Sequence, residues 1–275
     1  MKLQFTNGYR PRFDLISRIM QYIFSRNEGK NILRKDIIDS LGIPDKQVEN
    51  LSSMMTGFGL VKATKTGTLT PLGKTITEND PYFENVATLW IIHYIVSSNP
   101  RWVVWHRVIN QVIPMHHEIT IELVQNNYLQ NLDAHYSEKT IKEKLPKEIG
   151  AVLASYTRSE LSRLEILDVG DGGKYMKGDP IEIPFLSFLF SVIYFRDVFS
   201  PGSTAVEIHQ IATAENSPGL VFNIPEYQVR AFLNEAKEKE IVNIEQFGNL
   251  DQVRFSSKAS QDEVLRMLYE ENYGA

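Results

Sequence analysis

Apolar residues recur every three or four positions along residues 13–26, which predicts a helix. A second helix is expected over residues 33–42, where a glycine marks its end. A third is expected over residues 43–59, where Ile-Pro-Asp marks its start. The next letters, LVKATKTGTLTPLG, alternate β-branched and polar residues around Thr66-Gly67. This alternation predicts a strand, a turn and a second strand.

Three short helices followed by a two-stranded wing are typical of a winged helix-turn-helix, and we predict this module over residues 1–78. The order helix, helix, hairpin returns later, with hairpins expected over residues 164–179 and 243–257. We therefore predict a mainly α protein with small β-hairpins, built from tandem winged helix-turn-helix-like modules around a central helical core. Residues 79–200 would form the central helical region, which could hold a second module, and residues 201–275 the last module.

The central region contains the most apolar stretches of the chain. One ends at Val96, and the other, residues 183–195, is too short to span a bilayer and predicts a buried helix. A helix is also expected around Pro146, which should kink or split it. The N-terminus lacks the apolar run of a signal peptide, so we expect a cytoplasmic protein with no membrane partner.

Charge is distributed unevenly along a chain that contains no cysteine. The lack of cysteine excludes disulfides, thiolate zinc sites, iron–sulfur ligation and thiol nucleophiles. The formal charge is −5, yet residues 1–74 hold twelve Lys/Arg and six Asp/Glu, a net of +6, while the rest hold seventeen and twenty-eight, a net of −11. Such asymmetry favours an anionic partner for the first segment and protein partners for the remainder.

Candidates for catalysis or ligand binding are scarce. The stretch GDGGK at residues 170–174 lacks the spacing of a nucleotide-binding loop and is better explained as a hairpin turn. His116 and His117 are adjacent, so their side chains point apart and do not readily share one metal ion. His93 lies in an apolar stretch, where a buried histidine bonded to a neighbouring helix is the simpler interpretation, with His106 as a candidate partner. We expect no enzyme activity, no cofactor and no metal.

Residues with a chemical reason to bind nucleic acid lie in the first module. The outer face of its third helix offers amide, hydroxyl and ammonium groups, which can bond base edges. Surrounding lysines and arginines could hold phosphates, and two arginines that flank Pro11 could reach along the backbone or into a minor groove. Glu49 lies within the same face and would repel phosphate unless it meets a cytosine amino group. The predicted nucleic-acid-binding residues are Arg10, Arg12, Arg34, Lys35, Lys46, Gln47, Asn50, Ser53, Lys62, Lys65 and Lys74.

Two sequence motifs carry a family resemblance. The stretch LTPLGKTITENDPYFENVATLWIIHY at residues 69–94, followed by SPGLVFNI at residues 217–224, resembles a bacterial family named domain of unknown function four-thousand-and-seven. Members of that family are often encoded beside genes for DNA phosphorothioate modification and phage defence. The resemblance therefore implies a DNA-linked defence or modification context, and it implies no catalytic residues.

The leading hypothesis is a non-catalytic, DNA-binding component of such a system. It would contact double-stranded DNA through residues 10–75 and bind proteins of a modification or restriction complex through its acidic remainder. One alternative is an adaptor or scaffold subunit, because winged helices also bind proteins. Another is a transcriptional repressor of its own locus, which would act as a homodimer on a palindromic operator. The sequence leaves open the DNA sequence or modification recognised, the oligomeric state and the partner proteins.

Overall fold

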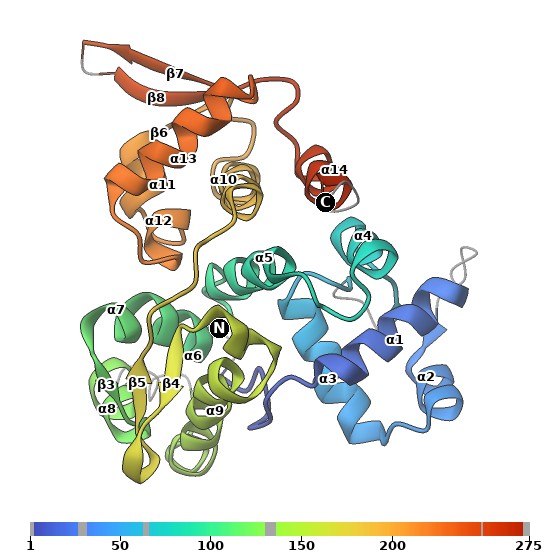
Figure 1. The fold of residues 1–275 in the computed structure, drawn as a ribbon. Coiled ribbons are helices and arrows are strands. Elements are labelled where there is room, and N and C mark those ends of the chain that lie inside the picture. Colours follow the sequence, from blue (N-terminus) through green and yellow to red (C-terminus); the bar gives the residue numbers. More distant parts are fainter. Residues whose placement is uncertain (1–2, 27–31, 63–65, 130–135, 249, 272–275) are drawn as a thin grey trace. The chain divides into compact units, whose positions relative to one another are not determined.

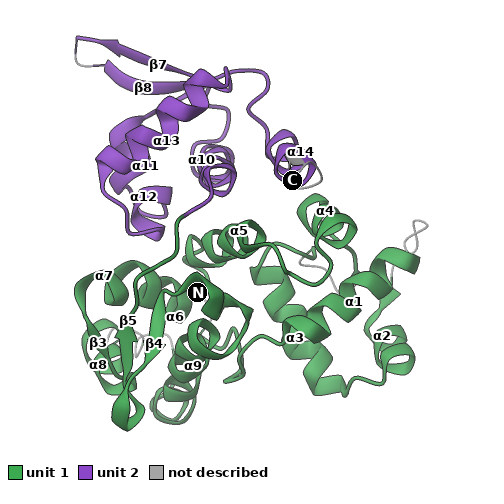
Figure 2. Cartoon of the chain, in the orientation of Figure 1, with its two compact units in different colours: residues 1–182 green, residues 183–275 purple. Residues whose placement is uncertain are grey.

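The computed structural model is mainly helical, with small antiparallel sheets, as predicted (Figure 1). The described residues are 3–26, 32–62, 66–129, 136–248 and 250–271. The chain divides into two compact units, residues 1–182 and residues 183–275 (Figure 2). The winged-helix character of the modules and their boundaries at residues 78 and 200 stay predictions.

The first unit begins with a helix and continues through two sets of strands and helices. Its elements are α1 (Phe13–Arg26), β1 (Ile32–Leu33), α2 (Arg34–Leu41), α3 (Asp45–Gly57), β2 (Thr66–Gly67), α4 (Pro71–Asn79), α5 (Val86–Ser97), α6 (Val103–Arg107), the π-helix η1 (Val108–Val112), α7 (Ile113–Met115), β3 (Glu118–Ile119), α8 (Ile121–Tyr128), α9 (Glu138–Arg158), the 3₁₀-helices η3 (Glu160–Leu164) and η4 (Asp171–Gly173), and the strands β4 (Leu167–Val169) and β5 (Tyr175–Lys177).

The second unit is smaller and ends in a hairpin and a helix. Its elements are α10 (Phe185–Phe199), β6 (Ala205–Glu207), α11 (Ile208–Thr213), α12 (Pro218–Val221), α13 (Glu226–Glu238), β7 (Val242–Phe247), β8 (Leu250–Phe255) and α14 (Gln261–Glu271).

A strand, helices and a hairpin follow one another at three places in the chain. Strand β1 precedes α2 and α3 and pairs antiparallel with β2, while an isolated bridge joins Val61 to Leu69. Strand β3 precedes α8 and α9 and belongs to a sheet of order β3-β5-β4. Strand β6 precedes α11, α12 and α13 and belongs to a sheet of order β6-β8-β7. In each case the strand before the helices pairs with the later arm of the hairpin. The expected recurrence of helix, helix and hairpin is therefore seen at all three places.

The turn between α2 and α3 has the predicted glycine. Gly42 has a φ of 65°, in the left-handed region that an L side chain rarely adopts, and its N–H donates to the carbonyl oxygen of Ile38. Pro44 then occupies the position before the first residue of α3, without a capping side-chain hydrogen bond. Three residues thus separate the two helices, as a helix-turn-helix connection requires.

The first hairpin differs from prediction at its turn. Thr66 and Gly67, expected as the turn, form strand β2 and pair with Leu33 and Ile32. Gly67 suits this place because a Cβ there would lie 3.2 Å from the Cδ1 atom of Ile23. Alternation of polar and apolar residues within this segment alone could not indicate that β1, a strand from an earlier part of the chain, pairs with it.

The motif LTPLG was expected as a wing strand, and only its first residue makes a β-type pairing. Leu69 makes the bridge to Val61, whereas Pro71 begins α4. The Oγ1 atom of Thr70 accepts the N–H of Gly73 at 2.9 Å and caps this helix. Proline fits the first turn of a helix, where its missing N–H would have no partner in any case.

Helix α5 lies in the interior of the first unit. Every residue from Ala87 to Ser97 is buried, as expected of a helix that is apolar on all sides. The Nδ1 atom of His93 lies 2.7 Å from the hydroxyl of Tyr156 on α9, and Trp105 donates its indole N–H to the same hydroxyl at 3.0 Å. His93 is therefore a buried histidine bonded to a neighbouring helix, as predicted, and Tyr156 is a partner that we did not anticipate.

Helix α9 runs without interruption through Pro146. Of the two predicted outcomes, a split is therefore wrong, and a kink at Pro146 stays a prediction. A proline inside a helix removes one hydrogen bond, and neighbouring packing can hold the helix together across that gap. Here Leu145, Ile149 and Val152 are fully buried on the same face of α9.

The second unit is organised around α10, the predicted buried helix. This helix packs against α12, α13 and α14, and the rings of Phe188 and Phe232 stack with centroids 4.5 Å apart. The β7–β8 hairpin lies where it was predicted, and Gly248 in its turn has a φ of 59°, while Asn249 is outside the described residues. Within the described ranges no helix has the length and apolar character needed to cross a membrane.

Candidate nucleic-acid interface

Helix α3 presents one face to the core and another to solvent. Val48, Leu51 and Met55 are buried, as the helical period predicted. Lys46 and Glu49 are exposed on the outward face. The lysine proposed to contact DNA and the glutamate that would repel it therefore share the exposed part of the helix.

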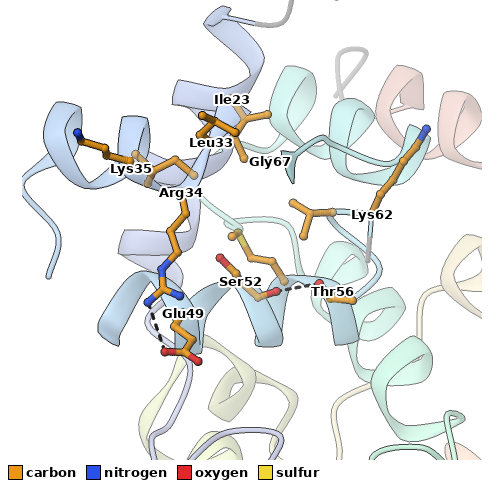
Figure 3. Close-up of a pocket in the computed structure, with 12 residues that line it drawn as sticks. Ile23, Leu33, Arg34, Lys35, Glu49, Ser52, Thr56, Lys62 and Gly67 are labelled. Atoms are coloured by element: carbon orange, nitrogen blue, oxygen red, sulfur yellow. Dashed lines mark hydrogen bonds and ion pairs between the residues drawn. The ribbon is translucent and has the colours of Figure 1, made fainter. Parts of the chain in front are cut away.

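Arg34, the first residue of α2, joins this helix to α3. Its Nε atom lies 2.7 Å from the Asp45 carboxylate, and its Nη2 atom donates to the carbonyl oxygen of Asp45 at 2.8 Å. The same guanidinium lies 3.3 Å from the carboxylate of Glu49 (Figure 3). Arg34 is thus engaged by the start of α3, and the charge of Glu49 is paired within the protein. A phosphate contact by Arg34 would have to compete with these interactions.

A groove of about 570 Å³ lies between α2, α3 and the β1–β2 pair, and we call it the α2–α3 groove (Figure 3). Leu33 lines it and is 55% exposed. Lys35 and Lys62 lie at opposite sides of the groove, and their ammonium groups point away from it (Figure 3). The buried apolar residues that line it are Ile23, Ile37, Met55 and Val61. The charged residues that line it are Arg34, Lys35, Lys62 and one acid, Glu49, which is paired with Arg34. The groove therefore combines an apolar floor with a rim on which cations outnumber acids.

The other flank of α3 faces the N-terminal segment, residues 3–9. The Nδ2 atom of Asn7 donates to the Oδ1 atom of Asn50 at 2.7 Å. Ser53 lines a second groove together with this segment and with Thr140 near the start of α9. Helix α3 is thus bordered on both flanks, and one of its predicted base-reading residues, Asn50, already has its amide oxygen bonded within the protein.

A buried carboxylate holds the N-terminal segment in place. The Oε1 atom of Glu148 on α9 accepts the N–H groups of Phe5 at 2.8 Å and Thr6 at 2.6 Å, and its Oε2 atom accepts that of Gly8 at 3.3 Å. Glu148 is only 1% exposed, and this burial raises the pKa of its carboxyl although the hydrogen bonds act in the opposite direction. The ring of Phe5 stacks on Trp102 with centroids 4.4 Å apart. The segment is therefore an integral part of the first unit.

Five of the predicted contact residues are exposed cations without an ion-pair partner in the part of the chain that the structure describes. They are Arg10, Lys35, Lys46, Lys62 and Lys74. These side chains could bind an anion without first breaking an interaction inside the protein.

The remaining predicted residues within the described ranges are less available. Arg12 bonds both carboxylate oxygens of Asp14, at 2.9 and 2.7 Å, and this hydrogen bonding lowers the pKa of Asp14. Gln47 and Ser53 are half-buried, and Lys65 lies outside the described residues. The structure thus brings Arg34, Lys35 and Lys62 to one groove and leaves Arg12 engaged elsewhere.

Sequence reasoning did not find Asn7, Leu33 or Glu148 as determinants of this surface. Glu148 did leave a signal, because it follows Leu145 by three positions and precedes Val152 by four, which places it on the buried stripe of its helix. An acid at such a position calls for donors, here the backbone of residues 5–8. No comparable pattern marks Asn7.

The side chains of this surface are of kinds that can bind a partner. Cations, side-chain amides and an apolar groove can hold an anionic or amphipathic partner. Within the described ranges no group of three or more His, Asp or Glu residues is placed to hold a metal ion.

Two solved structures have a similar fold. A crystal structure of SspB matches with a TM-score of 0.76 and 14% sequence identity, and it covers 99% of this chain and 89% of the SspB chain. A magnesium ion-bound crystal structure of SspB matches with a TM-score of 0.72 and 15% identity, over 98% of this chain and 87% of the other. At such low identity the likeness concerns the fold alone.

A comparison with curated proteins finds no match. The model of a protein family of unknown function, DUF4007, matches residues 7–269. That span covers most of both units and includes both motifs on which the resemblance rested. The chain therefore belongs to the DUF4007 family.

Proposed function

We propose that this protein is a non-catalytic, DNA-contacting component of a bacterial DNA-modification or phage-defence system. The family to which the chain belongs suggests that context, and the SspB-like fold over nearly the whole chain supports it. The contact with double-stranded DNA is assigned to α2, α3 and the hairpin that follows them. Partner proteins of the same system would bind the acidic remainder of the chain.

The main observation behind the proposal is that three exposed lysines, Lys35, Lys46 and Lys62, are free to bind an anion. These residues come from α2, α3 and the first hairpin, and none is ion-paired within the described ranges. A duplex presents closely spaced phosphates, so separate cations around one helix-turn-helix can each neutralise one of them. The segment that holds them, residues 1–74, has a net charge of +6 from twelve Lys/Arg and six Asp/Glu. The order strand, helix, helix, hairpin, with the first strand paired to the later arm, is also that of a winged helix, a motif that lays its second helix in a groove of DNA.

Glu49 opposes this contact less than its sequence position suggests. Arg34 lies 3.3 Å from its carboxylate, so a phosphate that approaches α3 meets an ion pair at this position. Arg34 is accordingly assigned a positioning role between α2 and α3, and the phosphate contacts are assigned to the lysines.

A second candidate function is that of a protein adaptor. The apolar floor of the α2–α3 groove and the 55% exposure of Leu33 favour it, because the phosphates of DNA offer no apolar surface to cover them. In that case a stable complex with a partner would bury the groove.

The two candidates differ in what the purified protein binds. Fluorescence anisotropy with labelled duplexes at low salt, unmodified and phosphorothioated, should detect binding if the DNA-contact proposal is right. The adaptor function would be favoured if the protein bound no duplex and co-purified with a partner protein that buries Leu33. The non-catalytic role is tested by incubating supercoiled plasmid with the protein and Mg²⁺, where nicking or cleavage would contradict it.

A further inference from the structure

The β7–β8 hairpin carries an exposed apolar pair at its end. Phe247 is 87% exposed and Leu250 is 43% exposed. The two residues lie directly opposite each other in the last cross-strand pair of the hairpin, so their side chains project from the same face of the ladder. An aromatic and an aliphatic side chain are therefore displayed together in water at the end of a protruding element. We call this pair the hairpin tip.

Interactions of the residue next to Leu250 hold the hairpin tip in place. Asp251, next to Leu250, is ion-paired with Arg230 of α13 and accepts a hydrogen bond from Gln246 at 3.0 Å. Arg230 also bonds Glu226 at 2.7 Å, one helical turn away. A tip that is held in this way loses little conformational freedom when it binds, which favours association.

The charge of the second unit indicates what kind of partner the tip can meet. Residues 183–275 hold seven Lys/Arg and thirteen Asp/Glu, a net of −6. A unit of this sign repels nucleic acid phosphates at long range and attracts a cationic protein surface. The partner should therefore offer an apolar groove within a basic surrounding.

The α2–α3 groove of this same protein has that character. Its floor is apolar, Leu33 is exposed in it, and Lys35 and Lys62 lie at its sides. The surrounding residues 1–74 carry a net charge of +6, opposite to that of the second unit. We propose that the hairpin tip of one chain docks into the α2–α3 groove of a second copy, with Phe247 and Leu250 covering Leu33.

This contact joins different surfaces of the two copies. Such a heterologous contact can repeat from chain to chain and build short linear assemblies unless geometry closes it into a ring. It covers only a few side chains on each partner, so association is expected to be reversible and dependent on protein concentration. The contact itself is made by apolar side chains, whereas the lysine ammonium groups assigned to DNA point away from the groove (Figure 3).

The absence of native cysteine allows a direct test with the full-length chain. A Gln246→Cys chain, which keeps Phe247 and Leu250, is mixed with a Lys35→Cys chain, which keeps Leu33, because both positions are exposed beside the proposed contact. The mixture is treated with a short bis-maleimide, which tolerates imperfect alignment of the two thiols. The control replaces the second partner by Met115→Cys, at a position that is 74% exposed in the same unit as Leu33. We expect at least tenfold more cross-linked Gln246→Cys/Lys35→Cys heterodimer than control product. Equal yields would overturn the proposal.

Sedimentation velocity without DNA provides the second measurement. The wild-type chain should associate as its concentration rises, and the double variant Phe247→Ser/Leu250→Ser should raise the dissociation constant at least tenfold. Val198→Ser, which removes another exposed apolar side chain of the second unit, should leave the constant unchanged. A wild-type chain that remains monomeric at every concentration, or an association that the double variant does not weaken, would overturn the proposal. Neither result would bear on DNA contact.

Discussion

Glu148 accepts a hydrogen bond from the backbone N–H of Phe5 at 2.8 Å, although the two residues are 143 positions apart. The bond ties the N-terminal segment to α9, and the same segment contacts α3 through the hydrogen bond from Asn7 to Asn50. One flank of the helix that we assign to DNA contact therefore depends on a buried carboxylate in a distant part of the sequence.

Replacement of Glu148 by alanine should lower the free energy of unfolding by about 3 kcal/mol. The substitution leaves the backbone N–H groups of Phe5 and Thr6 without their acceptor, whereas that of Gly8 keeps the hydroxyl of Thr6, and a buried unsatisfied donor costs about 1–3 kcal/mol. Urea denaturation followed by circular dichroism measures the change. Glu143→Ala, an exposed site on the same helix, should change the free energy of unfolding by less than about 0.5 kcal/mol. Equal effects of the two substitutions would contradict the anchoring role of Glu148.

The pKa of Glu148 also predicts how stability depends on pH. Burial raises this pKa in the folded state, so the folded protein retains a proton that the unfolded chain releases. The stabilisation from Glu148 is complete at acidic pH and is lost as pH rises through the raised pKa. The unfolding free energy of wild type minus that of Glu148→Gln should therefore decrease as pH rises above the ordinary glutamate pKa of about 4.3. A difference that increases with pH would show that the hydrogen bonds outweigh burial and lower the pKa instead.

Glu49→Gln should tighten DNA binding roughly threefold, equivalent to about 0.7 kcal/mol. The substitution removes a negative charge from the exposed face of α3 and releases one of the contacts that occupy Arg34. Anisotropy titrations at constant salt measure the effect. Glu238→Gln, which removes an exposed charge from the second unit, serves as the control and should change affinity little. Weaker binding by Glu49→Gln would mean that Glu49 itself contacts a base, as a cytosine amino group would allow.

Much of the helical framework could be predicted from local patterns, because those patterns have local causes. The buried stripe of α3 follows from the spacing of Val48, Leu51 and Met55, and the end of α2 follows from the left-handed conformation of Gly42. Hairpins with a glycine in their turn, such as β7–β8, were also predictable for this reason.

Features that depend on distant partners were not predictable in this way. The pairing of Thr66 and Gly67 with β1 involves a strand more than thirty residues earlier, so they were mistaken for a turn. Burial on one face of α9 holds that helix together through Pro146. The same limit applies to the site, where periodicity indicated that Asn50 points outward but could not reveal that Asn7 bonds it.

The salt dependence of DNA binding tests the central claim most directly. The logarithm of the association constant should fall linearly with the logarithm of salt concentration, and each lost phosphate contact should reduce the slope by about 0.9. The variant Lys35→Ala/Lys62→Ala should therefore reduce the slope by about 1.8, whereas Lys237→Ala, an exposed lysine of the second unit, should leave it unchanged. A wild-type protein that binds no duplex at low salt, or a slope that the double variant does not alter, would contradict the proposed DNA contact.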